Sequence, residues 1–174
     1  MTKRLLLIDG HSMAYRAFFA LPAENFTTAQ GQHTNAIYGF ATMLISLIKE
    51  EKPTHIAVAF DVSRKTFRTE IFPEYKANRS KTPDEFRSQM SYLHELVSAF
   101  GIQQFEIEGY EADDIIATIT KRAEKEKCEV LICTGDRDSF QLVNDQTTIL
   151  YPKRGVSEMS RMTPEAELLL LRFR

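Results

Sequence analysis

The stretch Arg4-Leu5-Leu6-Leu7-Ile8-Asp9-Gly10 decides the fold, because a run of apolar residues leads directly into an aspartate and a glycine. Such a run, bounded by a turn signal, predicts a strand buried on both faces of a parallel sheet. The pattern returns at residues 55–61 and 129–134, and the third copy is followed by Gly-Asp-Arg-Asp at 135–138. Gly10 is expected to serve a tight exit from the first strand.

Weaker strand patterns occur at residues 104–107 and 147–151, the second as an edge strand. Helical apolar spacing covers residues 35–50, 83–100 and 111–127. The middle helix is predicted to begin with a capping box of Thr82 and Glu85. Strands that alternate with helices predict an α/β fold with a mostly parallel sheet.

Residues 62–81 show no clean period and therefore predict a long connection, which in compact domains is usually functional or disordered. Between positions 64 and 81 the chain carries six basic residues against two acidic ones, and three aromatic residues lie among them. The basic residues are Arg64, Lys65, Arg68, Lys76, Arg79 and Lys81, and the aromatic ones are Phe67, Phe72 and Tyr75. Basic side chains can bind the phosphates of a nucleic acid, and aromatic side chains can stack on its nucleobases. The alternative is a solvated connection whose Phe67 and Phe72 pack on the body of the protein.

The formal net charge of −2 argues at first against a nucleic-acid partner. However, seven of the 24 acidic residues gather at predicted strand and helix ends, so the remaining surface carries more bases than acids. The chain begins without a signal peptide pattern and lacks an apolar run of spanning length, which favours a cytoplasmic location. Cys128 and Cys133 match no zinc spacing and are expected to be reduced core thiols.

Seven carboxylates are predicted to meet at the edge of the sheet where ligands of parallel α/β folds bind. They are Asp9, Asp61, Glu111, Asp113, Asp114, Asp136 and Asp138. So many carboxylates repel one another unless cations offset the charge, and Mg²⁺ or Mn²⁺ prefers carboxylate oxygen ligands. Two such ions can clamp a phosphodiester and activate water.

Each acid also has a structural explanation. An aspartate after a strand often caps a helix, and Asp113 and Asp114 complement the dipole of the helix that they begin. Asp138 could cap a short helix at 139–143, and Asp61 could hold a loop. Only the convergence of the set through the predicted topology favours a metal site.

The motifs at 7–18, 59–61, 72–79, 109–114 and 134–138 together resemble the 5′-nuclease family. This family includes the N-terminal 5′→3′ exonuclease domain of bacterial DNA polymerase I and the flap endonucleases. The resemblance covers roughly residues 3–166. It implies a PIN-like α/β core at 1–166 under a helical arch formed by about residues 62–90.

The resemblance also implies roles for individual residues. Asp9, Glu111, Asp113, Asp136 and Asp138 match metal-binding acids, and Asp61 and Asp114 match associated acids of the same catalytic site. Lys76 and Arg79 fall where the arch contacts the reacting phosphate, with Tyr75 beside them. Arg16, Lys65 and Lys81 are further candidates for nucleic-acid contact.

The activity implied is divalent-metal-dependent 5′→3′ exonuclease and flap endonuclease cleavage, with two Mg²⁺ or Mn²⁺ ions in the complete enzyme. The expected partner is DNA with a 5′ flap, nick or RNA primer in replication and repair. The domain is expected to form part of a larger polymerase polypeptide in the bacterial cytoplasm, without forming an oligomer.

The sequence departs from this family after residues 163–166, which begin a helix. The family's Gly-Asp-x-x-Asp-Asn motif and helix-hairpin-helix element do not follow, so residues 167–174 are interpreted as a truncated or non-native tail. One alternative is therefore a non-catalytic fragment that binds nucleic acid and metal. Another is a phosphate-handling receiver-like or phosphatase domain, which is disfavoured because Gly10 and His11 follow Asp9 where a receiver would have paired acids.

Overall fold

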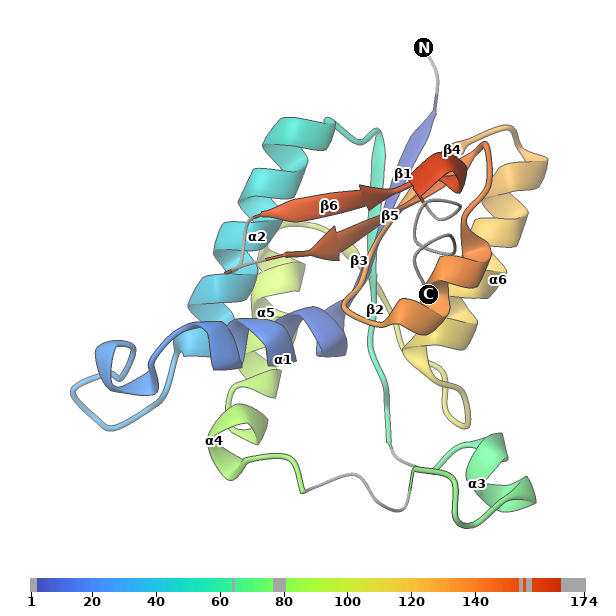
Figure 1. The fold of residues 1–174 in the computed structure, drawn as a ribbon. Coiled ribbons are helices and arrows are strands. Elements are labelled where there is room, and N and C mark those ends of the chain that lie inside the picture. The colour runs from blue at the N-terminus through green and yellow to red at the C-terminus, as the bar shows by residue number, and fades with distance from the viewer. Residues whose placement is uncertain (1–2, 64, 77–80, 154, 156–157, 167–174) are drawn as a thin grey trace.

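The central feature of the computed structural model is a six-stranded sheet with the order β3-β2-β1-β4-β5-β6 (Figure 1). The structure describes residues 3–63, 65–76, 81–153, 155 and 158–166. The strands are β1 (Arg4–Asp9), β2 (His55–Ala59), β3 (Gln103–Phe105), β4 (Glu129–Cys133), β5 (Thr147–Pro152) and β6 (Met159–Met162). All neighbouring strands pair in parallel except β5 and β6, which are antiparallel. The predicted α/β class is therefore confirmed.

Helices cover both faces of the sheet, which explains the continuous apolar runs of its central strands. Leu6 and Ile8 of β1 pack with α1 (Gly10–Ala20), α2 (Asn35–Glu51) and α5 (Met90–Ala99). Leu7 faces the opposite side and packs with α6 (Ala112–Lys125). Alternate side chains of a strand point to opposite faces, so a strand between two helical layers must be apolar at every position. No helix among the described residues has both the length and the apolar character to cross a bilayer.

Helix α1 follows β1 without a loop and was not predicted. Asp9 is its N-cap, because the Asp9 Oδ1 accepts a hydrogen bond of 3.0 Å from the Ser12 backbone N–H. Gly10 is the first residue of the helix, where an added Cβ would lie 2.3 Å from Cε1 of the Phe60 ring. The glycine is thus required by the close approach of Phe60, and its φ is not positive.

The helix predicted at 83–100 is divided into α4 (Asp84–Arg87) and α5, with Pro83 rather than Thr82 at the N-cap position. The break falls at Gln89, whose side chain is fully buried. Its Oε1 accepts from the Ala36 backbone N–H at 2.9 Å, and its Nε2 donates to the Asn35 Oδ1 at 2.9 Å. The side chain of Gln89 thus satisfies the start of α2, because the side chain of the N-cap Thr34 does not cap the helix and donates to the Phe26 carbonyl at 3.0 Å instead.

The described part of the connection after β2 contains a helix that the periodicity of the sequence did not predict. It contains α3 (Phe67–Ile71), which is begun by a capping box between Thr66 and Thr69. At its other end, Phe86 of α4 is fully buried with its ring 5.2–5.6 Å from the rings of His11, Tyr15 and Phe18. The β-bridge between Thr66 and Gly109 and the burial of Phe86 thus attach α3 and α4 to the body of the protein.

Smaller differences complete the comparison with the sequence. Strand β6 was not predicted, β3 begins one residue earlier than expected, and β2 ends at Ala59. Two short 3-10 helices, η1 (Ala23–Asn25) and η2 (Arg137–Leu142), also occur. The helix expected after Thr163 begins at 164–166, and the proposed tail at 167–174 lies outside the described residues.

Candidate metal and phosphate site

The predicted acids lie at one edge of the sheet because β1 is paired with both β2 and β4. Asp9 is the last residue of β1 and is in register with Ala59, two residues before Asp61. Asp136 follows β4 by three residues, and α6 begins directly after Glu111. The sequence prediction that separate strand ends and a helix start supply the acids thus agrees with the topology.

Asp9 is buried, with 5% of its surface exposed. Its pKa is raised from 3.8 to about 7, mainly by burial and also by the negative charges of Asp113 and Asp61. Two hydrogen bonds oppose this shift, from the Ser12 backbone N–H and from the Thr134 hydroxyl, which donates to the Asp9 Oδ2 at 3.1 Å. A carboxyl in this position favours its neutral form unless a cation approaches.

Asp113 is the second acid with a raised pKa. Burial is the main cause, followed by the charges of Asp136 and Asp61, and together they bring its pKa to about 6. Its Oδ1 atom is buried without a hydrogen-bond partner among the described residues. Buried polar atoms are normally satisfied, so an unpaired carboxylate oxygen that is repelled by neighbouring carboxylates fits a place for a cation.

Asp61 and Asp136 each hold a backbone segment. The Asp61 Oδ1 accepts a 2.7 Å hydrogen bond from the Ala112 backbone N–H and so fixes the start of α6. Asp136 caps η2 by accepting from the Asp138 backbone N–H at 2.9 Å. The suggestion that Asp138 caps a helix at 139–143 is therefore wrong, because η2 starts at Arg137 with Asp136 as its cap. The side chain of Asp138 is exposed.

We call Asp9, Asp61, Asp113 and Asp136 the inner carboxylates, because their charges act on one another. Glu111 and Asp114 form an outer pair that faces the basic connection instead. Among the described residues, no three carboxylate, imidazole or thiol groups lie close enough together to hold one metal ion. The donor chemistry and the unpaired oxygen of Asp113 fit a divalent cation, whereas the metal-ligand roles of individual acids stay predictions.

Glu111 is bound by the connection. Lys76 Nζ donates to its two carboxylate oxygens at 2.9 and 2.8 Å, and the Tyr75 hydroxyl donates to Oε2 at 3.3 Å. Lys76 and Tyr75 were predicted to lie near the reacting phosphate, and the structure places both beside a predicted metal-binding acid. Lys76 also has a backbone φ of 57°, which is unusual for a residue other than glycine.

Arg68 is a site residue that the sequence did not single out. Its two terminal nitrogens donate to both oxygens of Asp114, each at 2.7 Å, and this contact is the main cause of the lowered pKa of Asp114. Arg68 also lies 3.8 Å from the Glu111 Oε2. The only sequence signal for Arg68 was its place among the basic residues at 64–81. Such a run of basic residues does not show which of them pairs with which acid.

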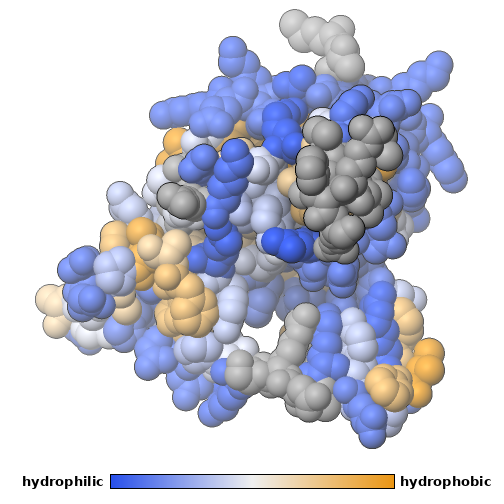
Figure 2. Space-filling model, viewed as in Figure 1, coloured by the Kyte–Doolittle hydropathy of each residue, from blue (hydrophilic) through white to orange (hydrophobic). Residues whose placement is uncertain are grey.

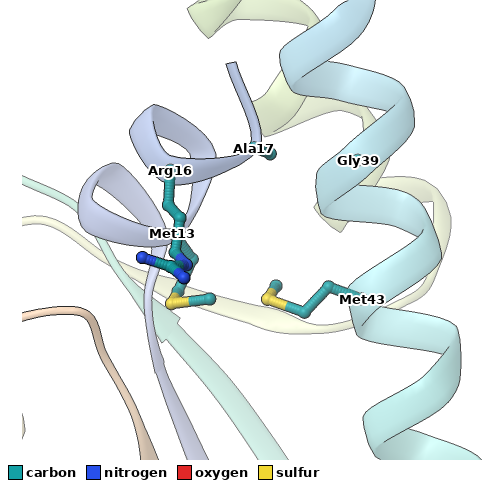
Figure 3. Close-up of a pocket in the computed structure, with 5 residues that line it drawn as sticks. All are labelled: Met13, Arg16, Ala17, Gly39 and Met43. Atoms are coloured by element: carbon teal, nitrogen blue, oxygen red, sulfur yellow. The ribbon is translucent and has the colours of Figure 1, made fainter. Parts of the chain in front are cut away.

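The other residues predicted to contact nucleic acid are not paired with the acids of the site in the described part of the structure. Arg16 lines a small cavity with Met13, Ala17, Gly39 and Met43 (Figure 3). Its Nη2 donates to the Lys153 carbonyl at 2.6 Å, which links α1 to the end of β5. Lys65 is exposed, Lys81 lies 3.8 Å from Asp84, and Arg79 is outside the described residues.

A mostly parallel sheet with neighbouring carboxylates at its carboxyl edge defines an α/β domain of the kind that generally binds ligands at that edge. The sequence matches the family described as 5′-3′ exonuclease, N-terminal resolvase-like domain, over residues 4–169. The chain belongs to this family, which confirms the resemblance seen in its motifs.

Relatives and solved structures agree with this membership. DNA polymerase I of Mycobacterium tuberculosis is 59% identical over 162 residues, which cover 93% of this chain and 18% of that protein. The enzyme of the same name from Bacillus subtilis is 49% identical over 163 residues, 94% of this chain and 18% of that protein. The chain thus spans less than a fifth of these relatives.

The fold is also similar to that of the flap endonuclease of bacteriophage T5, which was crystallised with DNA and metal ions. The TM-score is 0.67 at 24% identity, over 86% of this chain and 55% of the phage protein.

Proposed function

We propose that this domain is a divalent-metal-dependent, structure-selective 5′-nuclease that hydrolyses phosphodiesters near a free 5′ end. The observation that carries the proposal is the unpaired, buried Oδ1 of Asp113 among the inner carboxylates, in a chain of the 5′-3′ exonuclease family. The relatives named DNA polymerase I support a place in a longer polymerase polypeptide.

Asp9, Asp113 and Asp136 would hold Mg²⁺ or Mn²⁺, with Glu111 and Asp138 as further ligands and with Asp61 and Asp114 as associated acids of the same site. Bound cations would supply an activated water and stabilise the leaving oxygen. Asp61 fixes the start of α6 and so orients Asp113, which is the second residue of that helix. Asp9 joins the same edge to the start of α1, so the acids are held by rigid elements, as accurate positioning requires.

Lys76 and Tyr75 would contact the phosphate from the connection. In the structure the Tyr75 hydroxyl and the Lys76 ammonium group donate hydrogen bonds to the Glu111 carboxylate. Both side chains of the connection therefore lie next to the carboxylate edge. Lys76 supplies a point charge, and Arg68 keeps the outer acids in place through its bidentate contact with Asp114. Arg16, Lys65, Arg79 and Lys81 stay candidates for contacts with the rest of the strand. The substrate would be DNA with a 5′ flap, nick or RNA primer.

A second candidate is a fragment that binds nucleic acid and metal without cleaving. It is favoured by the absence of a three-ligand group among the described residues and by the pairing of Glu111 with Lys76. In that case the complete site would need ligands from outside this chain. The domain boundary at 166 and the absence of an oligomer also stay predictions.

Cleavage of a 5′-labelled flap duplex separates the two candidates. The chain would be incubated with Mg²⁺ or Mn²⁺, or with a chelator, beside an Asp136→Ala variant that keeps its circular dichroism spectrum. Short 5′ products that need metal and disappear in the variant support the nuclease. Metal binding by calorimetry with no cleavage supports the binding fragment, and unchanged cleavage by Asp136→Ala would remove that residue from the site.

A further inference from the structure

The two borders of the carboxylate edge differ in their exposure to solvent. On the side of the connection, Phe67 and Phe72 expose 39% and 55% of their surfaces, so the alternative that both pack on the body is wrong. Figure 2 shows hydrophobic side chains gathered there, over α3 at the lower right of the molecule. On the side of β4, by contrast, Thr134 is fully buried. A buried hydroxyl cannot contact a nucleic acid, so Thr134 acts at this edge only through the residues that it touches.

The Thr134 hydroxyl links two of the inner carboxylates. Ile8 is in register with Cys133, which brings the residues that follow them, Asp9 and Thr134, to the same end of two paired strands. The hydroxyl donates to the Asp9 Oδ2 at 3.1 Å and accepts from the Asp136 backbone N–H at 3.1 Å. A hydroxyl carries one hydrogen and two lone pairs, so it makes both bonds at once. One buried group thus joins the end of β1 to the turn that carries Asp136.

Ser12 makes a second link between the same two turns. Its backbone N–H donates to the Asp9 Oδ1 at 3.0 Å, and its Oγ accepts from the Gly135 backbone N–H at 3.1 Å. The turns are in direct contact here, because a Cβ added to Gly135 would lie 3.0 Å from the Ser12 Oγ. Together, Ser12 and Thr134 hold both oxygens of Asp9 and the backbone of residues 135 and 136.

These bonds orient the acids and still leave them able to bind a cation. A carboxylate has about four lone-pair sites, and each oxygen of Asp9 uses one of its sites for the Ser12 or the Thr134 bond. Asp136 is held through its backbone N–H, so the link to Thr134 uses neither of its carboxylate oxygens. Carboxylates that bind metal are usually held in this way by hydrogen bonds from neighbouring groups.

We propose that Thr134 is a positioning residue, assisted by Ser12, that holds Asp9 and Asp136 in the relative position that cation binding requires. This inference rests on the proposed nuclease function and adds to it two hydroxyl residues that act through the acids. It explains why a threonine lies at a fully buried position directly after an apolar strand, where a hydroxyl is costly to bury without partners.

Removal of the hydroxyl tests the role of Thr134. Thr134→Val keeps the size of the side chain and loses both hydrogen bonds, so the affinity for Mn²⁺ in isothermal calorimetry should fall about 10–100-fold. Thr134→Ser keeps the hydroxyl and should restore most of the affinity. The matched control is Thr120→Val, because Thr120 is also fully buried but its hydroxyl has no hydrogen-bond partner among the described residues. This control should bind Mn²⁺ like the unmodified chain.

Ser12→Ala is the second test, at a position that is only partly buried. It removes the acceptor of the Gly135 N–H and keeps the backbone bond to Asp9, so the affinity for Mn²⁺ should fall by a smaller factor than in Thr134→Val. This variant decides the matter if Thr134→Val loses its circular dichroism spectrum. Mn²⁺ affinity that neither variant lowers overturns the inference.

Amide hydrogen exchange, measured by nuclear magnetic resonance in chelator, tests the same links without metal. The Asp136 N–H should exchange about tenfold faster in Thr134→Val, and the Gly135 N–H should do so in Ser12→Ala, since each loses its acceptor. Thr134→Ser and Thr120→Val should leave both rates close to those of the unmodified chain. Unchanged rates in Thr134→Val and Ser12→Ala overturn the inference.

The flap-cleavage assay keeps this inference separate from the proposed function. Metal-dependent cleavage together with equal Mn²⁺ affinity in Thr134→Val and the unmodified chain removes the positioning role and leaves the nuclease. Weaker Mn²⁺ binding by Thr134→Val, in a chain that does not cleave the flap, supports the positioning role and removes the nuclease activity of this chain. If the unmodified chain does not bind Mn²⁺, the exchange rates decide whether Thr134 holds the two acids together.

Discussion

The ammonium group of Lys76 lies 2.8 and 2.9 Å from the two carboxylate oxygens of Glu111. It thus forms an ion pair with a predicted metal ligand. The pair is mostly screened from water, with 30% of the Lys76 and 14% of the Glu111 side chain exposed. If Glu111 binds metal, a cation in the inner site must compete with Lys76.

This competition predicts that Lys76→Met binds Mn²⁺ more tightly than the unmodified chain. An ion pair with this partial exposure is worth about 1 kcal/mol, which corresponds to roughly fivefold in affinity. Isothermal calorimetry of the two proteins measures the difference, and the exposed Lys65→Met serves as the control. Weaker metal binding by Lys76→Met would mean that the lysine does not compete for Glu111.

The bidentate contact of Arg68 with Asp114 predicts that Arg68→Ala destabilises the fold by about 1–3 kcal/mol. Both partners are partly buried, and a charge-assisted pair of hydrogen bonds is stronger than a neutral one. Arg68→Lys should recover little of the loss, because an ammonium group cannot reproduce the fork geometry.

Urea unfolding measures the effect of Arg68. The matched control is Arg87→Ala, since Arg87 pairs with Asp84 at the surface with 62% and 75% of the side chains exposed. That change should cost less than about 0.5 kcal/mol. Equal losses in the two alanine variants would show that the contact with Asp114 contributes no more than a surface pair.

The sequence predicted the parts of this structure that follow from local periodicity. Residues 5–8 of the strand Arg4–Asp9 are all apolar because helices cover both faces of the strand, and the acid at its end is placed by the same topology. Helix α1 was missed, although a helix cap was considered as the alternative role of an aspartate that follows a strand, as Asp9 does. The break at Gln89 depends on a partner more than 50 residues away, the start of α2, which no local pattern reveals.

The arrangement of the acids at the site was predictable only in part. Convergence of the acids follows from the strand order, whereas their division into inner and outer groups depends on the fold of the connection. The sequence showed that residues 64–81 are basic, but the assignment of Arg68 to Asp114 and Lys76 to Glu111 requires coordinates.

The raised pKa of Asp9 predicts a pH-dependent stability of the metal-free protein. In the folded state the pKa is about 7, above its ordinary value of 3.8, so the folded protein holds a proton that the unfolded chain releases in this range. The stabilising contribution is complete below about pH 4 and is lost as the pH rises through about 7. Asp9→Asn removes this dependence because an amide does not titrate. Its oxygen can still accept a hydrogen bond from the Ser12 N–H, and its nitrogen can donate one to the Thr134 hydroxyl.

Urea unfolding in chelator at about pH 5 and about pH 8 measures this contribution. Asp9→Asn should be more stable than the unmodified chain at the higher pH by roughly 1–3 kcal/mol, with a smaller difference at the lower pH. Asp113 also has a raised pKa and titrates in both proteins, so the difference between them measures Asp9 together with its interaction with Asp113. Parallel pH profiles for the two proteins would show that Asp9 is ionised in the metal-free fold.

The close approach of Gly10 and Phe60 predicts that Gly10→Ala destabilises the domain by about 1–3 kcal/mol. The new methyl group would lie 2.3–2.7 Å from three atoms of a fully buried ring, so the ring or the start of α1 must shift. In a helix the same substitution would otherwise be stabilising, which makes its sign diagnostic.

A double-mutant cycle with Phe60→Leu tests the cause, because the smaller side chain leaves room for the methyl group. The cost of Gly10→Ala should fall by at least about 1 kcal/mol in that background. An equal cost in both backgrounds would place the origin of the strain elsewhere than in the Phe60 ring.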